Sequence, residues 1–351
     1  EDCRRQRQMC IRDSFITNIF YFVLFIFITS FISCEKKLNV KTIRLAHGLD
    51  VNHSVHLAML NINSNLKKLS KGKLQIKIYP NQQLGSEREC LELLQIGSLD
   101  MTKVSAAVLE NFAPKLKIFS LPFLFDDKKH LFKVLDGQIG TELLKEMEKY
   151  FLKGLCYYDS GSRSFYTKNY PITEPKDLKG LKIRVQESVT AIDMVKNLGG
   201  SPTPISWGEL YTALQQGVVD GAENNSPSFY LSKHYEICKF YSIDEHTMIP
   251  DILIISIHMW NRLDKEEKNW LKEAINKSVS YQRELWEKAE KNALKAVIDA
   301  GVKVSYPEKK AFQKLTKKIY KIFEKDSTMA QLIERISNCL LYTSPSPRDK
   351  S

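Results

Sequence analysis

Paired carboxylates are the side chains in this sequence that come closest to catalytic chemistry. Glu209 and Glu223 could be drawn as a general acid and a general base. Glu209, however, stands three residues after Ser206, which is the spacing of a capping box at the start of a helix. The sequence also contains no P-loop, G-x-G-x-x-G, H-E-x-x-H or G-x-S-x-G motif. We therefore expect a binding protein and not an enzyme.

Cysteines are the second reactive group, and their spacing favours neither a metal site nor a disulfide framework. Of the seven, four lie near the ends of the chain, including Cys34. The others, Cys90, Cys156 and Cys238, are far apart in the sequence and form no C-x-x-C motif. We expect these three to be small buried apolar residues. The sequence predicts no metal and no cofactor.

The basic charge balance raises the question of an anionic partner. The net charge is +11, but the lysines occur as scattered pairs without interleaved aromatic residues. We therefore expect no nucleic acid partner. The length of 351 residues, with 43% hydrophobic and 26% charged residues, is typical of two globular domains.

The N-terminal part indicates an exported protein. An apolar run at 15–31 is short for a membrane-spanning helix and is followed by small residues, as in a signal peptide ending near residue 34. The junction resembles a bacterial lipobox and predicts a lipid on Cys34, with ordinary signal cleavage nearby as the alternative. Segments 1–14 and 338–351 resemble translated adapter sequence and are excluded from the fold prediction. We expect a periplasmic protein that meets the membrane only through such a lipid anchor.

Two runs of alternating strands and helices follow. In the first run, period-2 or short apolar patterns predict strands at 42–46, 74–79 and 101–104, with helices at 55–70 and from Ser86 to about Gly97. In the second run, we predict strands at 155–158, 182–185, 218–222 and 252–257, with a helix at 206–216. Strands that alternate with helices in this way favour α/β lobes.

One helix is too long for a single lobe. Asp264 and Glu267 have the spacing of a capping box, and no proline or glycine follows before Gly301. The helix would contain about 36 residues and measure roughly 54 Å. We expect it to run along both lobes.

Several motifs, in this order, resemble the signature of the solute-binding proteins of TRAP (tripartite ATP-independent periplasmic) transporters. They are 83–88 (QLGSER), 94–100 (LQIGSLD), 180–185 (GLKIRV), 198–204 (LGGSPTP) and 207–224 (WGELYTALQQGVVDGAEN). The resemblance extends over about 41–337. It implies a two-lobed α/β clamp, similar to periplasmic binding proteins, with a hinge, a solute cleft and the long helix spanning both lobes. We assign 37–160 plus 251–289 to lobe one, and 161–250 plus 290–337 to lobe two.

The resemblance also implies which residues bind the solute. Arg184 matches the arginine that pairs with the solute carboxylate, and a guanidinium fits a carboxylate bidentately; solvation at a strand edge is the alternative. Arg163 matches a second arginine near the pocket, unless it is a surface loop residue. Asn224 matches an asparagine that can both donate and accept, although Ala222 and Asn225 depart from the family pattern there, and a structural turn is the alternative.

The remaining candidates are an aromatic residue and four polar ones. Trp207 matches a position that is often aromatic and that would stack on a sugar ring, with core packing as the alternative. His47, Glu87, Lys103 and Asp251 are weaker candidates for ligand binding. Glu87 could instead serve a helix dipole, and Lys103 could be a solvated surface residue.

The two arginines, the flat ring of Trp207 and the mixed donors and acceptors indicate a hexuronate or similar sugar acid as the solute. C4-dicarboxylates and sialic acid are the rivals. The implied partners are the membrane permease subunits of a TRAP transporter. A ligand-binding sensor component would use the same clamp, and the sequence leaves that reading open.

Overall fold

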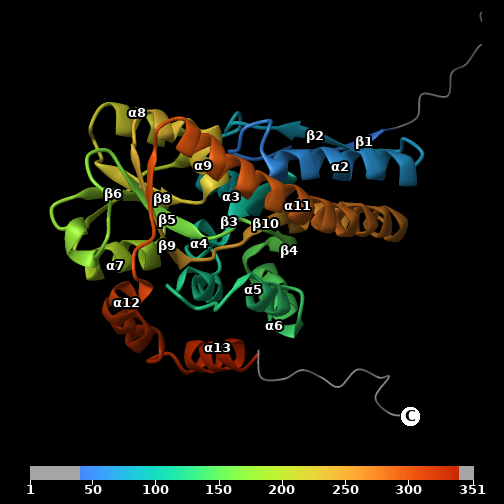
Figure 1. Ribbon diagram of the computed structural model, residues 1–351. Helices are drawn as coiled ribbons and strands as arrows, with labels where there is room; N and C mark the ends of the chain where they lie inside the picture. Colours follow the sequence, from blue (N-terminus) through green and yellow to red (C-terminus); the bar gives the residue numbers. More distant parts are fainter. Residues whose placement is uncertain (1–39, 340–351) are drawn as a thin grey trace, which may run out of the picture. The chain divides into compact units, whose positions relative to one another are not determined.

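The computed structural model describes residues 40–339, which form two mixed sheets with helices on their faces (Figure 1). The predictions for 1–14, the signal peptide and the lipid on Cys34 lie outside these residues. So does the predicted foreign tail, apart from Asn338 and Cys339.

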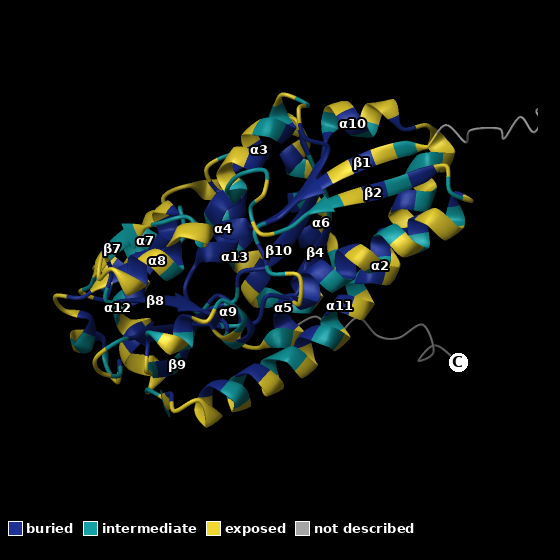
Figure 2. Cartoon of the chain, turned by 90° about the horizontal axis from the view of Figure 1, so that it is seen from above, coloured by how far each residue is buried: buried dark blue, intermediate teal, exposed yellow. Residues whose placement is uncertain are grey.

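The first sheet has the strand order β2-β1-β3-β10-β4. Its strands are β1 (Lys41–Ala46), β2 (Leu74–Tyr79), β3 (Met101–Ser105), β4 (Leu152–Tyr158) and β10 (Asp251–Ser256). β1 is parallel to β2 and β3, whereas β10 is antiparallel to β3 and β4. The apolar run of β10 is buried throughout (Figure 2), because its side chains face two cores alternately.

Helices cover both faces of this sheet. On one face, α2 (Ser54–Leu69) packs beside α11 (Lys265–Asp299). The other face is covered by α3 (Glu87–Gln95), α5 (Lys128–Leu135) and α6 (Gln138–Glu146). The predicted capping box of α3 is present, since the Ser86 hydroxyl accepts from Glu89 N and the Glu89 carboxylate accepts from Ser86 N.

The second sheet has the strand order β11-β9-β5-β8-β6-β7. Its strands are β5 (Arg163–Thr167), β6 (Lys182–Val185), β7 (Ser201–Pro204), β8 (Gly221–Asn224), β9 (Phe240–Thr247) and β11 (Lys303–Ser305). β5 is antiparallel to β8 and β9, and β6 is parallel to β7 and β8. The helices α7 (Val189–Asn197), α8 (Leu210–Gln215) and α9 (Ser226–Leu231) belong to this lobe.

Several segments of the described chain connect the two lobes. The chain crosses at 159–162 and returns at 248–250, and α11 runs past both. Leu271 and Ile275 of α11 belong to the core of the first lobe, whereas Val297 belongs to that of the second. The prediction of one long helix spanning both lobes is therefore confirmed, and the helix begins at the predicted Asp264 capping box.

The C-terminal helices divide between the lobes. α12 (Lys309–Phe323) packs on α7 and β9, whereas α13 (Ser327–Asn338) packs on the 3-10 helix η1 (Pro114–Ser120). His130 Nε2 lies 2.8 Å from Ile336 O. The proposed lobe boundaries remain a prediction, in which α13 belongs to lobe two in sequence and contacts lobe one in space. The other short elements are α4 (Ala106–Leu109), α10 (Ile257–Arg262), η2 (Met147–Tyr150), η3 (Pro175–Leu178), η4 (Trp207–Glu209) and η5 (His234–Glu236).

Two of the predicted elements differ clearly from the structure. The helix predicted at 206–216 divides into η4 and α8. The strand predicted at 218–222 begins only at Gly221, because Gly217 has a φ of 76° and Val218 N donates to Ala213 O. Residues 217–218 thus complete a left-handed helix cap instead of a strand.

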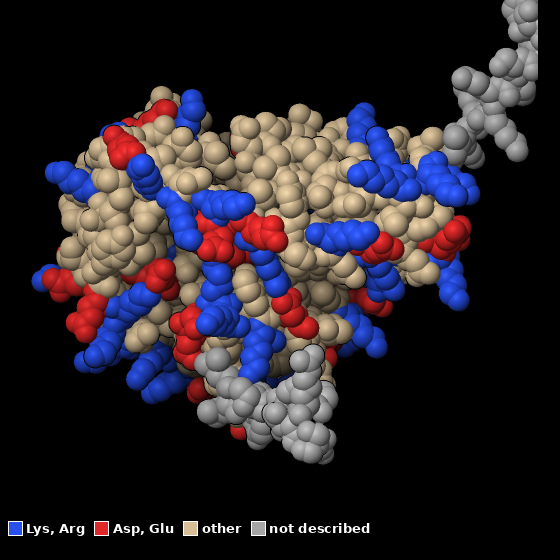
Figure 3. Space-filling view, turned by 45° about the vertical axis from the view of Figure 1, so that its right-hand side comes forward, with Lys and Arg blue, Asp and Glu red and all other residues tan. Residues whose placement is uncertain are grey.

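Cys90, Cys156 and Cys238 are buried, as predicted, and are free of disulfides. On the face drawn in Figure 3, Lys and Arg side chains are interspersed with Asp and Glu over several elements. Within residues 40–339, no helix has both the length and the apolarity needed to cross a membrane.

Candidate functional site

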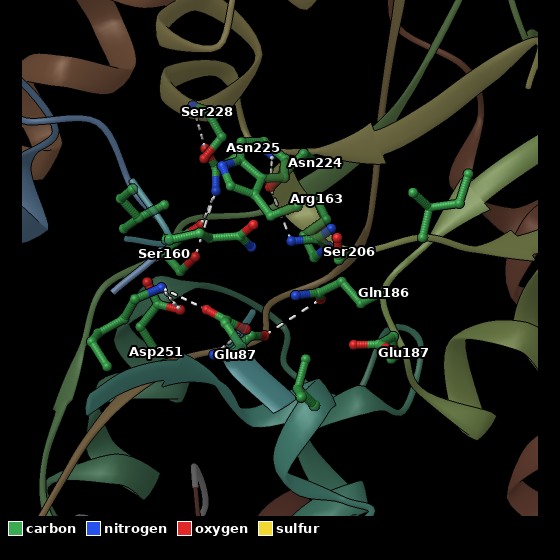
Figure 4. A pocket seen from close by; sticks show the side chains of 18 of the residues that line it. Glu87, Ser160, Arg163, Gln186, Glu187, Ser206, Asn224, Asn225, Ser228 and Asp251 are labelled. Atoms are coloured by element: carbon green, nitrogen blue, oxygen red, sulfur yellow. Dashed lines mark hydrogen bonds and ion pairs between the residues drawn. The ribbon is translucent and has the colours of Figure 1, made fainter. Parts of the chain in front are cut away.

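A cavity between the two sheets is lined by residues from both lobes (Figure 4). Glu87, Lys103 and Asp251 come from the first lobe, and Arg163, Arg184, Trp207 and Asn224 come from the second. Seven of the eight side chains predicted to bind the solute thus line one cavity. The eighth, His47, does not line it.

Arg184 extends from β6 into the cavity, and the inner edge of its guanidinium is held by protein atoms. Its Nε donates to Ile205 O at 2.8 Å, and its guanidinium carbon lies over the Trp207 ring, 5.7 Å from the centroid. Arg184 is only 3% exposed, and burial lowers its pKa. Its Nη1 has no hydrogen-bond partner among residues 40–339. The outer edge of the guanidinium is therefore available to a carboxylate.

Arg163, in contrast, is nearly saturated by protein atoms. Its Nε and Nη2 donate to the Glu223 carboxylate at 2.5 and 2.8 Å, and Nη2 also donates to Glu223 O at 2.8 Å. Nη1 donates to Asn224 Oδ1 at 2.9 Å. Because a guanidinium has five N–H groups, these four bonds leave a single N–H for a solute.

The buried Glu223 carboxylate holds Arg163 in place. Burial would raise the pKa of Glu223, but Arg163 and His246 outweigh it and lower that pKa to about 2. His246 lies 3.4 Å from Glu223 Oε2 through Nε2 and 2.9 Å from Asp244 Oδ2 through Nδ1. A carboxylate that stays ionised and is enclosed by two cations is a poor proton donor, so Glu223 positions Arg163 and does not act as an acid. The sequence prediction missed His246 and Asp244.

The two asparagines at the end of β8, Asn224 and Asn225, have different roles. Asn224 Oδ1 accepts from Arg163 and from Asn225 N, which leaves the Asn224 NH2 group as a donor toward the cavity. Asn225 caps α9, because its Oδ1 accepts from Ser228 N at 2.8 Å, and its Nδ2 donates to Ser160 O at 2.9 Å (Figure 4). Asn225 thus ties the segment that crosses between the lobes to α9.

On the first lobe, Lys103 forms a buried ion triad. Its Nζ lies 3.1 Å from Glu87 Oε1 and 3.2 Å from Asp251 Oδ1. Burial would lower the pKa of Lys103, but Asp251 and Glu87 outweigh it and raise that pKa. Glu87 Oε2 also accepts from Ser105 N at 3.1 Å. The ammonium has three N–H groups, so one of them can reach a solute.

The histidines after β1 are arranged differently from the prediction. His47 Nδ1 accepts from Leu49 N at 3.1 Å, and Nε2 lies 2.9 Å from His56 Nδ1. Both ring nitrogens of His47 are therefore used within the protein. His53 lines the cavity instead. Residue type and position after the strand could not separate these histidines, since only the turn before α2 decides which ring faces the cavity.

Other cavity residues carried weak sequence signals. Gln186 and Glu187 directly follow β6, where binding residues of α/β sheets gather. Gln82 also lines the cavity, and its Nε2 is buried without a partner among the described residues. Across 40–339, no group of three or more His, Cys, Asp or Glu side chains is arranged to hold a metal ion.

Comparisons with known proteins agree on one family. The DctP family profile, described as bacterial extracellular solute-binding protein, family 7, matches residues 45–326. The Salmonella typhimurium protein YiiZ, of uncharacterised function, is 37% identical over 296 residues, which cover 84% of this chain and 90% of YiiZ.

Solved structures are also similar. A TRAP periplasmic solute-binding protein from Bradyrhizobium sp. BTAi1, in complex with galacturonate, is 42% identical with a TM-score of 0.83, covering 85% of this chain and 100% of that one. A TRAP solute-binding protein from Anaerococcus prevotii with bound glucuronate is 35% identical with a TM-score of 0.83, covering 85% and 98%.

These matches confirm the resemblance seen in the motifs and the two-lobed clamp fold. They also confirm the prediction of a binding protein, because the family consists of solute-binding proteins and not of enzymes. The chain therefore belongs to the DctP family of bacterial extracellular solute-binding proteins, which serve TRAP transporters.

Proposed function

We propose that this protein captures a hexuronate, such as galacturonate or glucuronate, by its carboxylate and delivers it to the permease subunits of a TRAP transporter. One observation supports this most directly. Of three cavity cations in the described part of the chain, Arg163 pairs with Glu223 and Lys103 with Glu87 and Asp251. Arg184 has no ion pair there. A buried charge without a counterion is costly, so an anionic solute is the natural partner of Arg184.

The rest of the cavity favours a polyhydroxylated solute. Arg163 and Lys103 each have an N–H group left over, and Asn224 and Gln82 each offer an amide NH2 group. Glu87 and Asp251 carry carboxylate oxygens that can accept from hydroxyl groups. A short dicarboxylate would leave many of these groups unpaired, at about 1–3 kcal/mol for each buried one. The similar structures that hold galacturonate and glucuronate support the same choice.

The family membership supports the proposed delivery to a permease. The clamp would act in the periplasm and present its closed form to the membrane subunits. A sensor component would use the same closed form as its signal. Neighbouring genes for one small and one large membrane subunit would decide for transport.

The solute assignment is tested by competition. Purified protein is first saturated with galacturonate. Glucuronate, succinate, malate and N-acetylneuraminate are then offered as competitors, and binding is followed by calorimetry. We expect saturable binding of at least one uronate and displacement by the other. Saturable binding of succinate or N-acetylneuraminate without uronate binding would overturn the uronate proposal and leave the family unchanged.

A further inference from the structure

His53 combines burial, a fixed ring and an unused nitrogen. It is 3% exposed and lines the cavity at the start of α2. Its Nδ1 accepts from Val55 N at 3.2 Å, which caps the helix. Its ring packs against Trp286 of α11, with centroids 5.5 Å apart. Its Nε2 is buried and has no hydrogen-bond partner among residues 40–339.

The contact to Val55 fixes the tautomer of His53. A neutral imidazole has one N–H donor and one acceptor, and Nδ1 uses its lone pair for Val55 N. The hydrogen must therefore be on Nε2. Burial, together with the positive charge of Lys103, lowers the pKa of His53 to about 3, so the ring is neutral near pH 7. His53 thus presents one neutral donor at a fixed place.

We propose that the Nε2–H of His53 donates to a hydroxyl or ring oxygen of the bound solute and so selects solutes with an oxygen acceptor away from the carboxylate. This inference rests on the proposed function. Arg184, on the second lobe, would hold the carboxylate. His53, on the first lobe, would donate to a different oxygen of the solute. A solute without that oxygen leaves a buried donor unpaired, which costs affinity.

The charges around His53 favour an uncharged acceptor. In the nearby triad, Lys103 is already shared by the carboxyl groups of Glu87 and Asp251, so it offers little attraction to a second solute carboxylate. The neutral imidazole adds no positive charge for such a group. His53 therefore helps to discriminate a sugar acid from a dicarboxylate, which the carboxylate contact of Arg184 alone cannot do.

A chemical double-mutant cycle tests the inference. The variants are His53→Asn, whose shorter side chain keeps a capping oxygen for Val55 N but places no donor at the Nε2 position, and His56→Asn as a matched control outside the cavity. Each is titrated with galacturonate, glucuronate and their monodeoxy analogues. We expect His53→Asn to weaken uronate binding about tenfold, or about 1.4 kcal/mol. One deoxy analogue should bind poorly to wild type and to His56→Asn. Its affinity for His53→Asn should be little lower than its affinity for wild type.

A measurement on the wild-type protein does not depend on any variant. In nitrogen-15 NMR, His53 should show hydrogen on Nε2 from pH 5 to 8, and that hydrogen should shift when galacturonate binds. An unshifted His53 signal at saturation, or equal deoxy profiles for wild type and His53→Asn, would overturn the inference. Failure of wild type to bind any uronate would instead overturn the proposed function.

Discussion

Arg163 and Arg184 share a cavity but differ in what holds them. Arg163 is built into the protein by Glu223 and Asn224, so it shapes the site and offers one N–H. Arg184 lacks a counterion among the described residues and is supported by Ile205 O and the Trp207 ring. Trp207 therefore supports the proposed carboxylate anchor, Arg184, and its proposed stacking on a sugar ring would come in addition. Sequence motifs predicted both arginines but could not predict their pairing, which depends on strands that meet only in the fold.

The network under Arg163 predicts a pH dependence of stability. Burial would lower the pKa of His246, but Asp244 and Glu223 outweigh it and raise that pKa to about 9. A histidine whose pKa is raised on folding contributes its full stability below the unfolded value near pH 6.5, and loses it as the pH rises through about 9. The free energy of unfolding should fall by up to about 3 kcal/mol across this window.

Denaturant unfolding at pH 6, 7, 8 and 9.5 measures this effect in wild type and His246→Gln. The variant should be less stable at pH 6 and should lack this slope, because glutamine does not titrate. Parallel curves for the two proteins would show that His246 is not the titrating group.

At the scale of elements, local signals predicted those elements whose burial or helix N–H groups are satisfied within a short stretch of sequence. The capping boxes at Ser86 and Asp264 and the apolar run of β10 were visible because each is a local solution to burial or to free helix N–H groups. β9 was missed because its inward positions include Asp244 and His246, which break the apolar alternation to build the network. β7 was missed because two prolines in four residues are tolerated only on an edge strand such as this one.

Short elements at the cleft also contact each other across the lobes. Glu110, at the end of α4, accepts from Thr190 N in the first turn of α7 at 3.0 Å. The next residue, Asn111, donates through Nδ2 to Glu187 O at 2.6 Å. In a clamp that opens between its sheets these bonds must break. They therefore stabilise the closed state without touching the solute.

Glu110→Ala should consequently weaken solute binding. A hydrogen bond to a charged group contributes about 1.5–3 kcal/mol, so we expect a loss of roughly tenfold or more in affinity by calorimetry. Glu110→Gln, which keeps an acceptor oxygen, should lose less. The control is Glu92→Ala, at an exposed position of the same lobe. Equal affinities for Glu110→Ala and Glu92→Ala would rule out a contribution of this contact to closure.

At the scale of the whole molecule, the two lobes leave one buried cavity cation for a solute to pair. The first lobe contributes Lys103, which is already paired with Glu87 and Asp251, whereas the second contributes Arg184 without a counterion among residues 40–339. Closing the lobes over an empty cavity would bury that charge unpaired, whereas a carboxylate compensates it. We expect differential affinity of this kind to drive closure of the clamp. The family motifs predicted the two lobes, but the order in which α12 and α13 return to different lobes has no local signature.

The most direct test of this account is the affinity of Arg184→Lys for galacturonate and glucuronate, measured by calorimetry beside wild type. Lysine keeps the charge but not the planar fork of donors. We expect a loss of about 2–5 kcal/mol, or roughly 30-fold and more, with the denaturation midpoint of the unliganded protein little changed. Binding of both uronates by Arg184→Lys within about threefold of wild type would contradict the claim that Arg184 is the carboxylate anchor.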